Sequence, residues 1–200
     1  MYDDICKQVL SNKMILAWIM KGCMIEYREI SVEEIAKKYM EGKPYISSIN
    51  VRTGENIQGM PTEGRGITEG KVFYDIRFRA LIPGKDEIVE LIINVEAQND
   101  YYPGYPIVTR GVYYGCSMIS GQYGIEFTKS EYSKIKKVYS IWFCTDAPKY
   151  RQNSITSYDF KETNHIGNIC EKKKSYDLIS VVMVCLSEAT DEPSSNILKP

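Results

Sequence analysis

The sequence lacks the residue patterns on which several classes of protein depend. It has a single histidine, His165, in a polar stretch, so a site built from several histidines is excluded and serine or cysteine catalysis could use only that one. The six cysteines include no Cys-x-x-Cys pair, which is evidence against a zinc knuckle or a disulfide framework. Since no secretory leader precedes them, we expect a protein of the reducing cytoplasm.

Long apolar runs and an excess of one charge are also missing. The apolar stretch of residues 14–20 is far shorter than the roughly 20 residues that cross a bilayer, so we expect no membrane association. The formal net charge is -1, so the whole molecule does not attract a polyanion over long range and any contact with nucleic acid must be local. The 200 residues are 44% hydrophobic, which is typical of one globular domain.

The first part of the chain has helical patterns. Apolar residues recur at steps of three and four between about residues 4 and 27, which predicts an amphipathic helix. Ser31 and Glu34 have the spacing of a capping box, so a second helix should begin there and run to about residue 40. We expect Gly42 and Pro44 to end it, and residues 46–70, rich in glycine and proline, to form a long loop.

The rest of the chain has the pattern of a sheet with one long helix. Strands are predicted at residues 71–82, 88–98, 137–144 and 177–186, and a turn at residues 83–86 should make the first two a hairpin. Residues 105–122 have helical spacing, with Pro106 in the first turn. The glycines of this helix, Gly111, Gly115 and Gly121, each cost roughly 1 kcal/mol of helix propensity, so close packing on the sheet should compensate.

These elements predict an α/β domain with a central mixed β-sheet flanked by helices. We expect a single domain over residues 1–186, made of N-terminal helices (1–45), the long loop (46–70) and the sheet core (71–186). The polar residues 187–200 are expected to be a disordered tail.

The predicted hairpin carries acidic and amide side chains in alternating positions. Asn94, Glu96 and Gln98 share one face of the second strand, and an odd sum of paired residue numbers would put Asp75 on that face too. Two neighbouring carboxylates repel unless a proton, a basic partner or a cation separates them. Oxygen ligands favour Mg²⁺ or Mn²⁺, which could activate water to cut a phosphodiester. Alternatively, the two acids pair with Arg77, Arg79 or Lys71 on a solvated face.

Segments of residues 60–150 resemble the PD-(D/E)xK nuclease family transposases, which are related to recombination-promoting nucleases. The resemblance lies in Phe-Tyr-Asp-Ile-Arg-Phe at 73–78, Leu-Ile-Ile-Asn-Val-Glu-Ala-Gln-Asn-Asp at 91–100, Tyr-Pro-Gly-Tyr-Pro-Ile-Val-Thr-Arg-Gly-Val-Tyr-Tyr at 102–114 and Lys-Val-Tyr-Ser-Ile-Trp at 137–142. It implies a restriction-endonuclease-like core, DNA as partner, magnesium or manganese as cofactor, and a homodimer as one candidate assembly.

The resemblance also assigns roles to particular residues. Asp75 and Glu96 match the family's acids and would bind the metal with the Ala97 backbone carbonyl. Gln98 stands at the lysine of the family's E-x-K element, in the E-x-Q form common in this branch, so it could position water by hydrogen bonding without supplying charge. Glu63, in Met-Pro-Thr-Glu-Gly at residues 60–64, is a further candidate acid, and Glu69 is its rival.

Basic and aromatic residues complete the candidate site. Arg110 and Tyr114 are four residues apart on one helix face, where they could reach a phosphate or support the carboxylates, whereas Tyr113 should point into the core. Two lysine clusters could follow a phosphate backbone, Lys129, Lys134, Lys136 and Lys137 in one and Lys172, Lys173 and Lys174 in the other. The sequence predicts a magnesium-dependent DNA endonuclease, with a catalytically silent nuclease-fold protein that binds nucleic acid or protein as the alternative.

Overall fold

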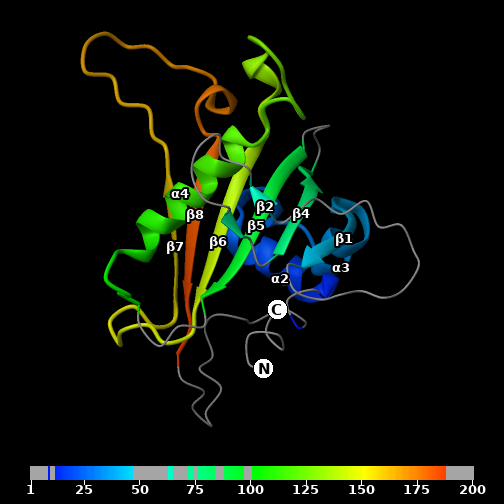
Figure 1. The fold of residues 1–200 in the computed structure, drawn as a ribbon, viewed down its shortest axis with the longest axis vertical. Coiled ribbons are helices and arrows are strands. Elements are labelled where there is room, and N and C mark those ends of the chain that lie inside the picture. Colours follow the sequence, from blue (N-terminus) through cyan, green and yellow to red (C-terminus); the bar gives the residue numbers. More distant parts are fainter. Residues whose placement is uncertain are drawn as a thin grey trace.

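One mixed sheet, with helices on both of its faces, forms the centre of the fold (Figure 1). The computed structural model describes residues 9, 12–46, 63–64, 72–73, 76–83, 88–96 and 101–187. The predicted α/β class with a central mixed sheet flanked by helices is confirmed for these residues. Within them, no helix is both long and apolar enough to span a membrane.

Six strands of the described chain form the main sheet. Their spatial order is β1 (Met40–Ile46), β4 (Ile76–Leu81), β5 (Ile88–Glu96), β6 (Lys137–Cys144), β8 (Ile179–Cys185) and β7 (Ser154–Asp159). The central strands β5, β6 and β8 are parallel, whereas β1, β4 and β7 run antiparallel to their neighbours. A separate antiparallel pair joins β2 (Glu63–Gly64) to β3 (Val72–Phe73).

The predicted strands are present among the described residues, and their described bounds match the predicted ranges or lie inside them. β4 and β5 form the predicted antiparallel hairpin, but the described part of the predicted strand 71–82 is divided into β3 and β4. β6 has the predicted bounds, and β8 lies inside the predicted range 177–186. The buried pattern along β8 agrees with a strand covered on both faces.

Two strands of the main sheet were not predicted from the sequence, and both are edge strands; β2 was not predicted either and lies in the expected loop of residues 46–70. We expected Gly42 and Pro44 only to end a helix, but they lie in β1. The register between β1 and β4 shifts between Glu41 and Tyr45, and such an edge irregularity can accommodate a proline. β7 is short and polar and its side chains are largely exposed, so it has no apolar periodicity to detect.

The predicted helix of about residues 4–27 is described only in part, at residue 9 and from residue 12 onward. Helix α2 (Lys13–Cys23) begins at Asn12, whose side chain accepts a 2.9 Å hydrogen bond from the Met14 amide. A short helix, η1 (Ile25–Tyr27), follows. The predicted capping box is confirmed on its Ser31 side, because the Ser31 hydroxyl accepts from the Glu34 amide at 3.2 Å. It starts α3 (Val32–Glu34), which continues into the π-helical turn η2 (Ile35–Tyr39).

Two apolar cores lie on opposite faces of the sheet. Along β6, Tyr139 and Ile141 pack toward α2, whereas Trp142 and Cys144 belong to the core on the other face. Helix α4 (Ile107–Ser120) covers that second face, where Ile107 packs with Val181. The chain between β6 and β8 also contains η4 (Lys173–Ser175), and η3 (Tyr132–Lys134) precedes β6.

Two glycines bring α4 close to the sheet, as predicted. A Cβ added at Gly111 would lie 2.7 Å from Val181 Cγ1 and 3.0 Å from Trp142 Nε1, and one at Gly115 would lie 2.4 Å from Ile179 Cδ1. The prediction of close packing on the sheet was wrong for Gly121, which caps the end of the helix. The placement of Pro106 in the first turn was also wrong, because Pro106 is the N-cap.

We expect Gly111→Ala to lower the free energy of unfolding by about 1–3 kcal/mol, because overpacking outweighs the helix propensity gained. Gly22→Ala in α2 is the matched control, since its Cβ would meet only Ile155 Cδ1, at 3.9 Å, and it should be neutral or stabilising. Urea denaturation measures both variants. Equal losses of stability in the two variants would contradict the close approach of α4 to the sheet.

Candidate functional site

The parallel strands bring three chain positions to one edge of the sheet. β5, β6 and β8 run in the same direction and end at Glu96, Cys144 and Cys185, which are paired across the sheet in that order. We call this the carboxyl edge. In open α/β sheets, ligands bind outside the carboxyl ends of the strands, so this edge is the first place to look for a site.

The hairpin has the register that the predicted metal site requires. Every β4–β5 pair joins an even-numbered residue to an odd-numbered one. Ile76 and Phe78 pack toward α2, so Arg77 and Arg79 share the other face of the sheet, which α4 covers. Position 96 of β5 pairs with Cys144, which belongs to the core under α4, so position 96 is on the same face as the two arginines.

Most of the predicted site residues are not described. Asp75, Ala97, Gln98 and Glu69 lie outside the described residues, and of Glu96 and Glu63 only the backbone is described. Glu63 begins β2, opposite Phe73. In the part of the chain with described side chains, no group of three or more histidine, cysteine or acidic residues could hold a metal ion. The carboxylate cluster therefore stays a prediction.

Arg110 and Tyr114 lie together, as their spacing predicted. The Arg110 guanidinium donates to the Tyr114 and Tyr105 hydroxyls, both at 3.2 Å. It also lies 5.3 Å from the centroid of the Trp142 ring, which Tyr114 contacts edge-on. Both of the proposed roles of Tyr114, packing on the sheet and facing the site, are compatible with this geometry.

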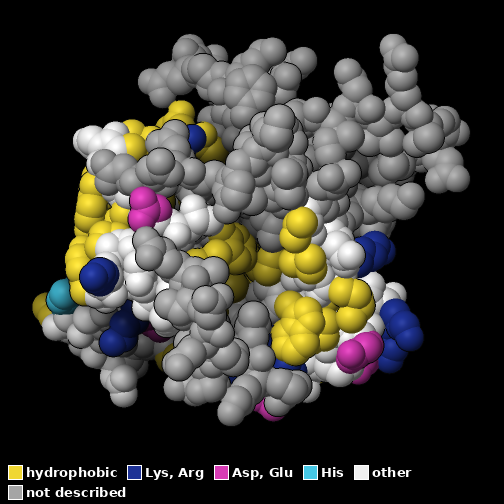
Figure 2. Space-filling model, turned by 90° about the horizontal axis from the view of Figure 1, so that it is seen from below, with side chains coloured by type: hydrophobic (Ala, Val, Ile, Leu, Met, Phe, Trp, Pro, Cys, Tyr) yellow, Lys and Arg dark blue, Asp and Glu magenta, His cyan; other side chains and the backbone are white. Residues whose placement is uncertain are grey.

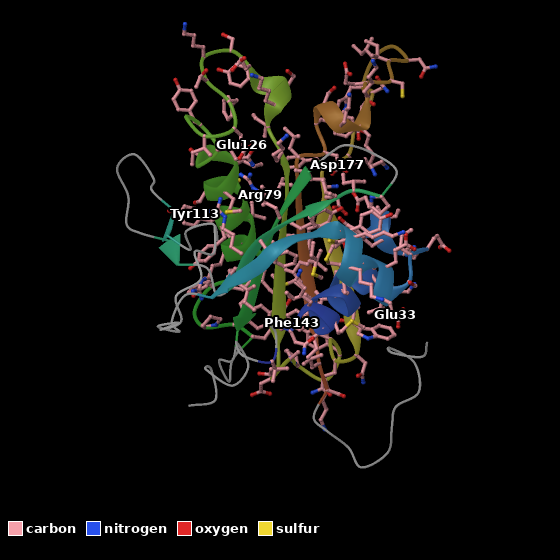
Figure 3. The ribbon with its side chains drawn as sticks, turned by 90° about the vertical axis from the view of Figure 1, so that its right-hand side faces the viewer. Glu33, Arg79, Tyr113, Glu126, Phe143 and Asp177 are labelled. Atoms are coloured by element: carbon pink, nitrogen blue, oxygen red, sulfur yellow. The ribbon has the colours of Figure 1, made fainter. Side chains whose placement is uncertain are left out.

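The prediction for Tyr113 was wrong. Its side chain is 47% exposed, on the outer side of α4 and away from the core (Figure 3). Consecutive helix residues point in different directions, so the neighbouring Tyr114, and not Tyr113, packs against Trp142 of the sheet.

A second aromatic group lies at the carboxyl edge, and we call it the tyrosine–arginine cluster: Tyr101, Tyr102, Tyr150 and Arg151. The Arg151 guanidinium lies 5.0 Å from the centroid of the Tyr101 ring and 5.6 Å from that of Tyr150. The Tyr102 and Tyr150 hydroxyls are 3.3 Å apart. Tyr101 is buried, and its hydroxyl has no hydrogen-bond partner among the described residues.

The cluster shifts the acidity of its members. Burial raises the pKa of Tyr101 to about 12. The hydrogen bond with Tyr102, together with Arg151, lowers the pKa of Tyr150. Arg151 therefore places a fixed positive charge among phenol groups at the end of the sheet.

Sequence analysis missed this cluster as a site. The stretch Tyr101-Tyr102-Pro103-Gly104-Tyr105 is visibly rich in tyrosine, but its spacing predicts no partner for the first two rings. Tyr150 and Arg151 belong to the connection between β6 and β7, and only the antiparallel return of the chain to β8 brings them to the same edge. No local pattern indicates that contact.

The predicted lysine clusters are partly committed to other contacts at the opposite edge. Lys137 Nζ is 2.8 Å from Asp177 Oδ2 and 3.8 Å from Glu26 Oε1, and Tyr139 donates to the same Glu26 carboxylate at 2.6 Å. Lys134 pairs with Glu131 at 2.6 Å. The grouping of these lysines into one surface for phosphates is therefore wrong for Lys137, whose side chain is mostly buried.

A scan against protein-family models, a search of curated proteins and a search of solved structures each found no match to this chain. The functional hypothesis is therefore based on the residues themselves and on the resemblance that their motifs show.

An ion pair joins the sheet to the segment after α4 on the face of the candidate site. Arg79 from β4 pairs with Glu126, and the two side chains lie next to each other in Figure 3. Their exposed fractions are only 25% and 13%. The pair fixes that segment over the hairpin.

We expect Arg79→Met to lower the free energy of unfolding by about 1–3 kcal/mol, because it removes the cation that faces a largely buried carboxylate. The exposed pair of Lys134 and Glu131 supplies the control, and Lys134→Met should cost less than about 1 kcal/mol. Denaturation in urea distinguishes the two. A loss no larger for Arg79→Met than for Lys134→Met would show that the first pair is as solvated as the second.

Proposed function

We propose that this protein is a metal-dependent DNA endonuclease of mobile-element (transposase) origin, with a restriction-endonuclease-like core and a site of action in the cytoplasm. The observation that carries the proposal is the hairpin register, which puts position 96 at the carboxyl edge and on the face that holds Arg77 and Arg79. The mixed sheet with helices on both faces agrees with the fold that the resemblance implies.

The donor chemistry of the proposed site suits a hard cation. Asp75, Glu96 and the Ala97 carbonyl would bind Mg²⁺ or Mn²⁺ through oxygen, the ligand atom that these ions prefer. The bound ion would lower the pKa of water and polarise the phosphodiester. Gln98 would orient the attacking water by a hydrogen bond, and Glu63 could accept a proton.

The described residues at the same edge fit a nucleic-acid partner. Tyr102, Tyr105 and Tyr150 are exposed there, and the guanidinium groups of Arg110 and Arg151 contact tyrosine rings or hydroxyls. Bases stack on aromatic rings, and guanidinium groups bind phosphates through paired donors. Figure 2, which views the molecule from below, shows hydrophobic side chains on this side, with both basic and acidic side chains near them.

Asp75→Ala should abolish nicking of supercoiled DNA in Mg²⁺ or Mn²⁺ and should remove metal binding in a calorimetric titration, because the site loses a charged ligand. Glu33→Ala, an exposed acid on α3, should leave both unchanged. Circular dichroism checks that the variants are folded. Folded wild-type protein that neither nicks DNA nor binds metal would overturn the enzymatic proposal.

That same outcome would favour the second candidate, a catalytically silent nuclease-fold protein that binds nucleic acid or a protein partner. The observation that favours it is Gln98, which lacks the positive charge that lysine supplies to water and phosphate in related motifs. Loss of one group that stabilises the transition state typically reduces the rate on the order of 10²–10³-fold.

We expect Tyr150→Ala to weaken DNA binding about 5- to 10-fold, as the loss of one stacked base would. Tyr132→Ala is the control, because Tyr132 is also exposed but precedes β6 at the opposite edge. Fluorescence anisotropy with a labelled oligonucleotide in a chelator measures binding without cleavage. Equal affinities for the two variants would place the DNA elsewhere on the protein.

A further inference from the structure

Two buried cysteines lie side by side in the sheet. Cys144 of β6 and Cys185 of β8 are register partners in adjacent parallel strands. Both carry a thiol outside any disulfide, both are buried, and both belong to the core on the α4 face. Their side chains therefore leave neighbouring strands in the same direction.

The strand geometry allows a bond between them. Neighbouring strands are about 4.8 Å apart, within the range of roughly 4.4–6.8 Å between the Cα atoms of disulfide-bonded cysteines. Parallel neighbours hold the two Cβ atoms side by side without converging, so a disulfide there would be strained. Strained disulfides are easily reduced, which makes such a bond reversible.

The surroundings of Cys185 favour its reactive form. A hydrogen bond with Cys144, with smaller contributions from Ser154 and the Arg151 charge, lowers the pKa of Cys185 to about 7. Ser154 is its register partner on β7. Cys23 is the contrast within the same molecule, because burial raises the pKa of its thiol to about 12. Of the two, only the Cys185 thiol is therefore close to ionisation at neutral pH.

We propose that Cys144 and Cys185 are an oxidation site that forms a reversible disulfide with hydrogen peroxide as the oxidant. The Cys185 sulfur attacks one peroxide oxygen and the O–O bond breaks. Water is released, and Cys185 becomes a sulfenic acid. The Cys144 sulfur then attacks the Cys185 sulfur, the S–O bond breaks, and a second water leaves. Two thiols and one peroxide become one disulfide and two waters. Both thiols are buried, so a small oxidant such as hydrogen peroxide should reach them more easily than a bulky disulfide reagent.

The site is next to the proposed metal site but does not depend on it. Glu96, Cys144 and Cys185 occupy one row across β5, β6 and β8. A bond between the two sulfurs would therefore form one strand away from the candidate metal ligand. The proposal concerns the thiols alone, so a protein without nuclease activity tests it equally well.

The test treats the folded, reduced full chain with hydrogen peroxide, blocks the remaining thiols by alkylation and maps disulfides by peptide mass spectrometry. We expect a Cys144–Cys185 linkage that dithiothreitol reverses. Cys144→Ser should abolish the linkage and leave a Cys185 sulfenic acid that dimedone traps when it is added together with urea after the peroxide is removed. Cys116→Ser with Cys170→Ser removes two exposed thiols and should leave the linkage intact.

Disulfide mapping in the wild-type protein tests the proposal even if the Cys144→Ser variant does not fold. Absence of the linkage in folded protein, or its appearance only in urea, would overturn the proposal. Preferential oxidation of Cys116 or Cys170, with Cys144 and Cys185 still reduced, would do the same.

Discussion

The close contact between α4 and the strand pair β6 and β8 is the constraint on which the arrangement of this protein depends. Gly111 and Gly115 let the helix backbone approach Val181, Trp142 and Ile179 more closely than any side chain would permit. A helix in this place connects β5 to β6, and such a crossover makes the two strands parallel. Parallel strands end at a common edge, so the packing of one helix creates the edge where the candidate site lies.

The two edges of the parallel strands have different chemistry. At the edge where β6 begins, Lys137, Glu26, Asp177 and Tyr139 form a mostly buried network of opposite charges and hydrogen bonds, which satisfies its members internally. At the carboxyl edge, exposed tyrosines surround guanidinium groups. The first arrangement is typical of a structural network and the second of a surface that meets a ligand.

The carboxyl edge also links the two proposals made for this protein. Position 96, proposed to bind a metal ion, is in one row with Cys144 and Cys185. Arg151 contributes to both the tyrosine surface and the low pKa of Cys185. For a substitution at this edge, DNA binding, metal binding and thiol oxidation therefore have to be measured separately.

The sequence alone determined those features that follow from local periodicity and capping. Alternation and apolar runs located the β4–β5 hairpin, β6 and β8, and the odd-with-even pairing of the hairpin agrees with the geometry expected from its turn. Ser31 predicted a helix start because its hydroxyl satisfies a free amide one turn later. The joint orientation of Arg110 and Tyr114 followed from helical spacing in the same way.

Only the tertiary structure decided the features that depend on partners distant in the chain. The edge strands β1 and β7 form because β4 and β8 offer unpaired backbone groups, not because their own residues favour strands. Lys137 is part of a buried network because Glu26, more than a hundred residues away, lies beside it. The meeting of Tyr102 with Tyr150, and of Cys144 with Cys185, follows from strand order and register, which residue spacing along the chain does not encode.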